Sequence, residues 1–148
     1  MAAGDLIVAD DQYEVNAFLM GAAPVLMGET AVEGWDTITV KGVEVDLDLG
    51  DGSVAGSDFL ASLTILVPIL IIEDTEAEAR DTLELAKAAW SPSGWTSVEL
   101  HRQVAGIHEK VTGRVKGIVP VMQYVAAGVI PALCTFRAND PTVTVVSS

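Results

Sequence analysis

Three aspartates stand close together in the chain and could supply oxygen ligands to a calcium ion. Asp46, Asp48 and Asp51 lie in the stretch DLDLGD. A calcium loop of the EF-hand type needs oxygen ligands at alternate positions and a bidentate glutamate at its end. In this sequence Gly50 stands where a third ligand belongs, and Ser57 replaces the glutamate. The spacing therefore favours a strand with a solvated acidic face, followed by a turn, over a metal site.

Two histidines and one cysteine are the next residues with chemistry of their own. His101 and His108 are seven residues apart and flank an expected hairpin, without the ligand spacing of a zinc site. We therefore expect both to be polar surface residues. Cys134 lies in an apolar stretch, where a free thiol usually packs as a small hydrophobic side chain. Because it is the only cysteine, an intrachain disulfide is excluded.

Motifs typical of enzymes are missing from the sequence. No serine stands in a G-x-S-x-G elbow, and the glycines of GDGSVAG lack the order of a phosphate-binding loop. Carboxylate pairs such as Asp10 and Asp11 are expected by chance in a chain with 21 acidic residues, so no acid–base pair can be singled out. The sequence therefore predicts no catalytic residue, no metal site, no cofactor and no enzymatic activity.

The elements that must position these residues are mostly strands. Residues 37–49 alternate between apolar and polar side chains, with a change of phase at Gly42, which predicts a half-buried strand pair or one long bent strand. Residues 50–57 are rich in glycine and predict a loop. Residues 60–72 are apolar on both faces, as in a strand that is central or covered by a partner. Pro68 cannot donate to a ladder and predicts an edge segment or a bulge.

One helix is expected at about residues 75–90. Thr75 and Glu78 have the spacing of a capping box, and Pro92 with Gly94 ends the helix near Trp90. The residues that recur at helical spacing and should face the core are Ala79, Leu83, Ala86 and Trp90. Further strands are expected at residues 97–103, 110–122 and 129–137, with the last residues trailing. This order predicts a mostly β, α+β fold: a β-sandwich or open barrel with one flanking helix.

Composition limits the possible partners. The chain has 148 residues, enough for one domain with a core, and a formal net charge of -13. Such a charge argues against nucleic-acid binding and against anionic membrane surfaces. The longest apolar run, residues 59–72, would be about 10 Å too short for a bilayer core if helical, and it contains Pro68. No membrane insertion and no signal peptide are therefore expected. The mean hydropathy of +0.41 points instead to a subunit interface.

Three tryptophans could form a platform for a ligand. Trp90, at the end of the helix, is expected in the core instead. Trp95 stands beside Gly94 and is expected in a loop that touches a neighbouring subunit, since tryptophan is favoured at interfaces. The role of Trp35 stays open.

The order of several short segments resembles a known family. Residues 13–22 read YEVNAFLMGA, residues 32–40 VEGWDTITV and residues 51–60 DGSVAGSDFL. The apolar strand and the helix follow, then TGRVKGIVP and a final strand that ends in FRANDP. Over residues 10–141 this order is similar to the N-terminal ring domain of siphophage distal tail proteins, also known as minor tail proteins. The sequence departs from the family at Leu63, and at Thr142 after Asp140 and Pro141, where arginine is common.

The resemblance implies a fold and an assembly. It implies a β-sandwich or split barrel with a flanking helix, related to the phage tail-tube fold. Residues 1–148 would be a single ring-forming domain, without the carbohydrate-binding-like C-terminal domain of many members. Six copies would form a ring at the distal tail of the virion, assembled in the host cytoplasm. The ring would join the tail-tube protein to the hub proteins of the tail tip or baseplate and let DNA pass without specific binding.

The resemblance also suggests where the functional residues lie. The acidic candidates for the lumen of the ring are Glu44, Asp46 and Asp48. The candidates for contacts between subunits are Asp51, Gly52, Trp95, Leu66, Pro68 and Leu70. Two alternatives remain open: the major tail-tube protein, which stacks in many copies, and a calcium- or ligand-binding β domain of a cell surface.

Overall fold

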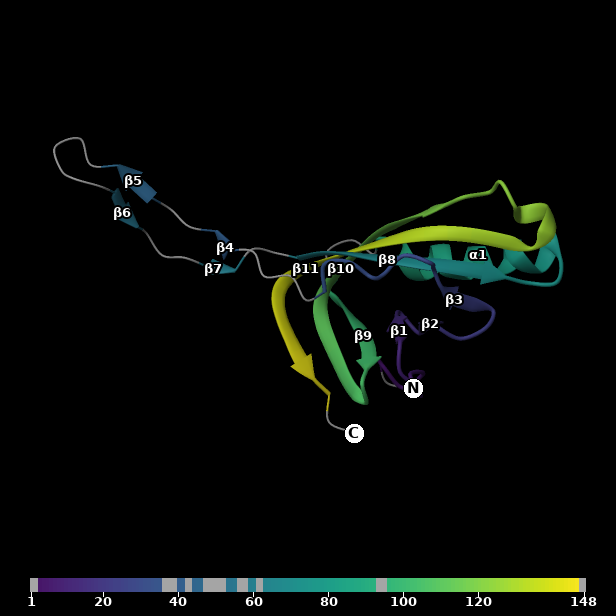
Figure 1. Cartoon of the computed structure of the whole chain (residues 1–148), viewed down its shortest axis with the longest axis horizontal. Helices are drawn as coiled ribbons and strands as arrows, with labels where there is room; N and C mark the ends of the chain where they lie inside the picture. Colours follow the sequence, from purple (N-terminus) through teal and green to yellow (C-terminus); the bar gives the residue numbers. More distant parts are fainter. Residues whose placement is uncertain are drawn as a thin grey trace.

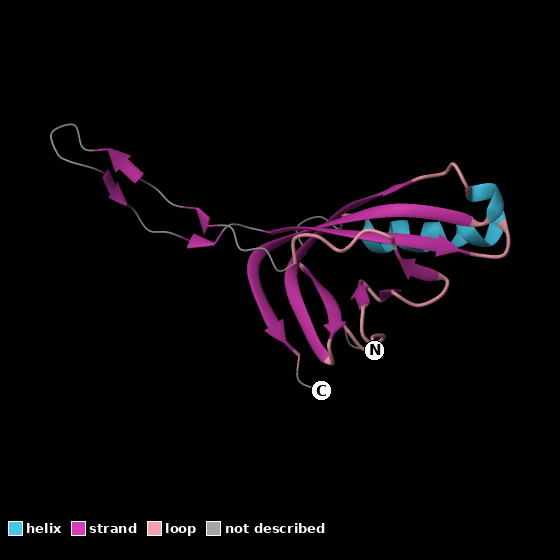
Figure 2. Cartoon of the chain, in the orientation of Figure 1, coloured by secondary structure: helices cyan, strands magenta, loops and turns pink. Residues whose placement is uncertain are grey.

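The computed structural model describes residues 3–35, 40–41, 44–46, 53–55, 59–60, 63–92 and 96–146. Most of these residues belong to a seven-stranded antiparallel sheet with a helix against it (Figures 1 and 2). The strands run in the order β2-β1-β9-β10-β11-β8-β3. Their bounds are β1 Gln12–Val15, β2 Phe18–Met20, β3 Val25–Met27, β8 Leu63–Ile72, β9 Val98–Val104, β10 Ile107–Pro120 and β11 Val129–Val145.

The two edge strands of this sheet meet. β2 and β3 follow each other in the chain, and the N–H groups of Gly21 and Ala22 both donate to the carbonyl oxygen of Val25, at 2.9 and 3.1 Å. The sheet therefore curls into a nearly closed barrel. This arrangement confirms the predicted mostly β fold, a sandwich or split barrel with a flanking helix.

Helix α1 spans Glu76–Trp90. The hydroxyl oxygen of Thr75 accepts a hydrogen bond from the N–H of Glu78 at 3.2 Å, so Thr75 is the N-cap, as predicted. The apolar residues that recur at helical spacing are buried against the sheet: Ala79, Leu83, Ala86 and Trp90. A short 3-10 helix, η1 (Val125–Ala127), precedes β11. The capping signal and the periodicity together confirm the predicted helix and its core face.

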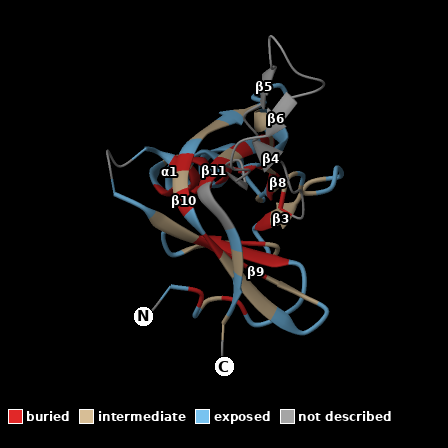
Figure 3. Cartoon of the chain, turned by 90° about the vertical axis from the view of Figure 1, so that its left-hand side faces the viewer, coloured by how far each residue is buried: buried red, intermediate tan, exposed pale blue. Residues whose placement is uncertain are grey.

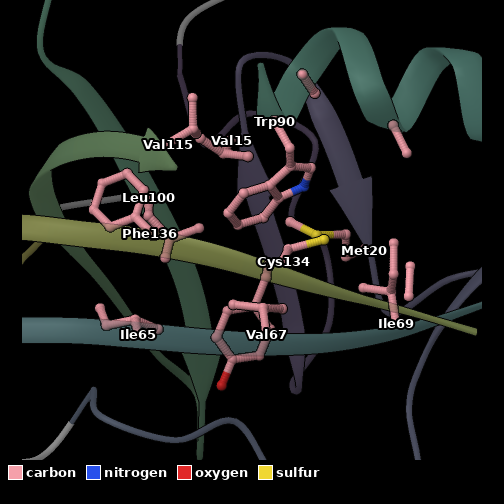
Figure 4. Close-up of a cluster of buried hydrophobic side chains, with 14 of the residues drawn as sticks. Val15, Met20, Ile65, Val67, Ile69, Trp90, Leu100, Val115, Cys134 and Phe136 are labelled. Carbon is pink, nitrogen blue, oxygen red and sulfur yellow. The ribbon is translucent and has the colours of Figure 1, made fainter. Parts of the chain in front are cut away.

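The core lies between α1 and one face of the sheet (Figure 4). In β8, Ile65, Val67 and Ile69 are at most 1% exposed, and they alternate with residues of the opposite face. Their partners in β11 continue this inner face, since Phe136 lies opposite Ile65 and Cys134 opposite Val67. Figure 3 shows that buried residues also occupy β9 and α1. The expected packing of Cys134 as a small hydrophobic side chain is confirmed.

Strands β10 and β11 are longer than predicted, and their backbones approach each other closely at Gly113. The final residues were expected to trail, yet Thr144 pairs with Lys110 and Val145 with Glu109. The register shifts where the two strands pass Gly113 and Arg137, and a side chain at Gly113 would place its Cβ 2.1 Å from the carbonyl oxygen of Arg137. Because of this close approach, β11 stays paired with β10 along its whole length. Its first part also pairs with β8, and its last part runs along the segment of β10 that pairs with β9.

Two further strand pairs come from the region between β3 and β8. β4 (Val40–Lys41) pairs with β7 (Phe59–Leu60), and β5 (Glu44–Asp46) pairs with β6 (Ser53–Ala55). Figure 1 shows both pairs away from the seven-stranded sheet.

The prediction of a loop at residues 50–57 is wrong at β6, because Val54 and its neighbours complete a ladder with β5. The strand predicted at residues 60–72 also begins later, as β8 at Leu63. Leu60 belongs instead to β7, where it pairs with Val40 of β4.

Replacing Gly113 with alanine should destabilise the protein. The new methyl group would overlap the backbone of Arg137, and overpacking of this kind costs about 1 to 3 kcal/mol. Urea unfolding followed by tryptophan fluorescence measures the change. Lys116→Ala, at an exposed position of the same strand, should lie within about 0.5 kcal/mol of the unchanged protein. Equal stability of Gly113→Ala and Lys116→Ala would contradict the close approach of the two backbones at Gly113.

Candidate functional site

Some of the predicted site residues cannot be placed. Asp48, Asp51, Gly52 and Trp95 lie outside the described residues, and only the backbone of Glu44 and Asp46 is described, in β5. The predicted acidic lumen therefore stays a prediction. In the part of the chain that the structure describes, no group of three or more His, Cys, Asp and Glu side chains could hold a metal ion. No helix in that part is long and apolar enough to cross a membrane.

The prediction that both histidines are surface residues is wrong for His101. The hairpin between them is present, formed by β9 and β10, but His101 is only 2% exposed. Its Nδ1 lies 2.9 Å from Nε2 of His108. His101 is buried because β9 lies between β1 and β10, and the N-terminal residues cover that face of the sheet.

Two of the three tryptophans are buried by the chain itself. Trp90 is fully buried in the core, as predicted. Trp35 is 2% exposed, with the Tyr13 ring edge-on at 6.1 Å and the Arg102 guanidinium 4.4 Å from the ring centroid. Because the faces of Trp35 are already occupied, Trp35 and Trp90 do not form a platform for a ligand.

The predicted contact residues Leu66, Pro68 and Leu70 lie together on one side of β8. They alternate with the core residues of this strand and so face away from α1. Leu66 and Leu70 are half-buried, and Pro68 is covered by the chain at Gly28, whose N–H donates to the Pro68 carbonyl at 2.9 Å. That hydrogen bond places Pro68 just beyond the end of β3, at the edge position that the sequence predicts.

The apolar surface continues from β8 across the neighbouring strands. In β11, Pro131 lies opposite Leu70 and Leu133 opposite Pro68, and Val119 of β10 lies opposite Leu133. We call this side of the sheet the outer face. Its described apolar residues are Leu66, Pro68, Leu70, Ile72, Val119, Val121, Tyr124, Val129, Pro131 and Leu133.

The outer face is exposed and hollowed. Val119 is 67% exposed, Tyr124 52% and Leu133 40%. Between them and Leu70 lies a hollow of about 730 Å³, and Glu29 is the single charged residue among the described residues that line it. Adjoining exposed apolar side chains around a hollow are typical of a protein contact.

Sequence reasoning missed most of this surface. Val119, Val121 and Tyr124 were not recognised as contact residues, although GIVPVMQYV contains more apolar residues than a half-buried strand needs. The strand expected at residues 110–122 included Val121. In the structure β10 ends at Pro120, and Val121 binds β11 from beyond that end, through its N–H to the Pro131 carbonyl at 2.7 Å.

A comparison with solved structures identifies the fold. The crystal structure of the SPP1 Dit (gp 19.1) protein matches 89% of this chain with a TM-score of 0.65 and 16% sequence identity. The chain has the fold of a siphophage distal tail protein. It spans about half of the SPP1 protein, since the match covers 51% of that chain. No protein-family model and no curated protein matches the sequence. The predicted resemblance to distal tail proteins is thus confirmed at the level of the fold.

The Cys134 thiol should not react in the folded protein. Burial raises the pKa of this thiol far above its ordinary value, so the reactive thiolate is absent near neutral pH. We expect a disulfide reagent at pH 8 to label less than about a tenth of the native protein, and all of it in denaturant. Fast labelling of the native protein would contradict the burial of Cys134.

Proposed function

We propose that this chain is a structural, non-enzymatic protein of the tail of a long-tailed bacteriophage. It forms a ring at the distal end of the tail, which joins the tail tube to the hub of the tail tip or baseplate. The observation that carries the proposal is the match to SPP1 Dit, a protein described as a paradigm of the hub adsorption apparatus of phages that infect Gram-positive bacteria. At 16% identity the match supports this role through the fold alone.

The outer face is the surface that we assign to the contact between neighbouring copies. Two copies of a chain with a net charge of -13 repel each other wherever carboxylates approach closely. A contact between them is stable only where both sides bury uncharged surface. The outer face meets this condition, because Glu29 is the one charged residue among the described residues that line its hollow. Leu66, Pro68 and Leu70 then lie at the contact, together with Val119 and Leu133.

The charge of the chain also suits a channel for DNA. A ring of strongly acidic subunits repels the phosphate backbone, so DNA passes without binding. Glu44, Asp46 and Asp48 remain our candidates for the lumen. Asp51, Gly52 and Trp95 remain candidates for further contacts between subunits. The ring contains six copies in this proposal and is assembled in the host cytoplasm.

Charged substitutions on the outer face should weaken assembly without unfolding the subunit. Val119→Asp and Leu133→Asp each place a charge where the proposal buries apolar surface, so the dissociation constant should rise at least about tenfold, which equals about 1.4 kcal/mol. Native mass spectrometry at increasing protein concentration measures it. The matched control is Leu85→Asp, because Leu85 is 65% exposed, as Val119 is, but lies on α1. Assembly equal to that of the Leu85→Asp protein would contradict the assignment of the outer face.

The number of copies in the virion separates a distal ring from a tail tube. We expect about six copies per purified virion, because a closed ring has a fixed number of subunits. Quantitative mass spectrometry with isotope-labelled peptides of this chain measures the number. A copy number near that of the most abundant tail protein would identify a tail-tube protein instead. Absence from purified virions would overturn both structural roles.

A further inference from the structure

One face of the sheet at β1, β9 and β10 is polar and covered by the N-terminus. Pairing places Glu14 opposite His101 and His101 opposite Lys110, so these side chains share a face, on the side opposite Arg102 and Trp35. The described residues of this polar face are Gln12, Glu14, Glu99, His101, Gln103, His108, Lys110 and Thr112. The proposed assembly role uses none of them.

Buried polar side chains of β1 hold the N-terminal segment on this face. Glu14 is 2% exposed, and its carboxylate accepts the N–H groups of Gly4 and of Leu6, the latter at 3.0 Å. Gln12 is 6% exposed, and its Oε1 accepts the N–H of Val8 at 2.8 Å. The turn at residues 3–6 is therefore fixed by hydrogen bonds to the sheet.

The two histidines lie directly beneath this turn. A side chain at Gly4 would place its Cβ 2.6 Å from Nδ1 of His101 and 2.9 Å from Cε1 of His108. Gly4 also has φ of +88°, which favours glycine. The turn thus packs directly on the imidazoles, with no room for a larger residue than glycine at position 4.

The neighbours of the imidazoles determine where their protons lie. Lys110 donates to Glu99 Oε2 at 2.7 Å, and this hydrogen bond holds the pKa of Glu99 below its ordinary value. Glu99 is therefore an acceptor, and His101 Nε2, at 3.1 Å from Glu99 Oε1, must donate. In the neutral His101 ring Nδ1 then accepts, so His108 Nε2 is the donor of the 2.9 Å hydrogen bond.

The hydrogen bond between the histidines tolerates one added proton but not two. A single added proton leaves one of the facing nitrogens with a lone pair, so the bond survives. When both rings are protonated, an N–H group faces an N–H group across 2.9 Å, and two positive charges lie together in a site that is only partly open to solvent.

We propose that His101 and His108 form a pH-sensitive latch, which holds the turn at residues 3–6 closed near neutral pH and releases it when both rings are protonated. The charged and titratable groups that face the pair are Asp5 in the turn, Glu14 in β1, Glu99 in β9 and Lys110 in β10. Release separates the imidazoles, removes their support for Gly4 and exposes Glu14.

The pH dependence has a definite sign. Burial, followed by the charge of His101, lowers the pKa of His108 from its ordinary value of 6.5, against the opposing carboxylates of Glu14 and Asp5. A lowered histidine pKa stabilises the closed form fully above pH 6.5, and this contribution is lost as the pH falls through the lowered value. The latch therefore opens on acidification.

Hydrogen–deuterium exchange of the whole chain tests the latch. After correction for the intrinsic pH dependence of exchange, protection of the peptide that covers residues 3–9 should fall at least about tenfold between about pH 7.5 and pH 5. The peptides of β9 and β10 should keep their protection. Unchanged protection of residues 3–9 in acid would overturn the proposal.

Two variants separate the histidine pair from other effects of acid. In His108→Gln the side-chain amide still donates to His101 but cannot be protonated. Protection of residues 3–9 in this variant should therefore change less than about threefold between about pH 7.5 and pH 5. Gly4→Ala should open the turn already at about pH 7.5, because its Cβ has no room above the imidazoles. The same acid-induced loss in His108→Gln, or full protection in Gly4→Ala, would refute the latch. If His108→Gln fails to fold, the exchange protection of residues 3–9 in the unchanged protein and in Gly4→Ala still tests the latch.

Discussion

The structure depends on the antiparallel ladder between β8 and β11. It runs without a bulge from Leu63 opposite Ala138 to Ile72 opposite Val129. Because side chains alternate along a strand, this register assigns every second residue of both strands to the core and the others to the outer face. If the register slipped by one residue, side chains such as Pro68 and Leu133 would face the core in place of Val67 and Cys134. One ladder therefore determines both the stability of the subunit and the surface that we assign to assembly.

Part of this architecture can be predicted from the sequence. Helix α1 is predictable because its signals are local: Thr75 caps it, Leu83 and Trp90 keep its period, and Pro92 follows it. The apolar strand before it is predictable for the same reason, since no turn signal interrupts it between Leu63 and Ile72. The family resemblance extended these local signals to the complete fold.

Other features depend on contacts between distant residues and escape such reasoning. His101 looks like a surface residue in the sequence, and only the fold of the N-terminal turn over β9 buries it. β6 stands among glycines that predict a loop, and its strand exists through pairing with β5. The candidate site was predictable only in its β8 part: Leu66 and Leu70 follow from the excess of apolar residues in that strand. Val119 and Leu133 required the register between β10 and β11.

The edge of β8 that faces away from β11 is covered from Leu66 to Ile72. The N–H of Ile72 donates to Pro24, the carbonyl of Pro68 accepts from Gly28, and Leu66 exchanges two hydrogen bonds with Glu33. Beyond them, the meeting of β2 and β3 joins the two borders of the sheet. Open strand edges invite unlimited edge-to-edge polymerisation into fibrils. From Leu66 to Ile72 this edge therefore offers neighbouring molecules side chains instead of backbone, which favours a contact through the outer face over the addition of a further strand here.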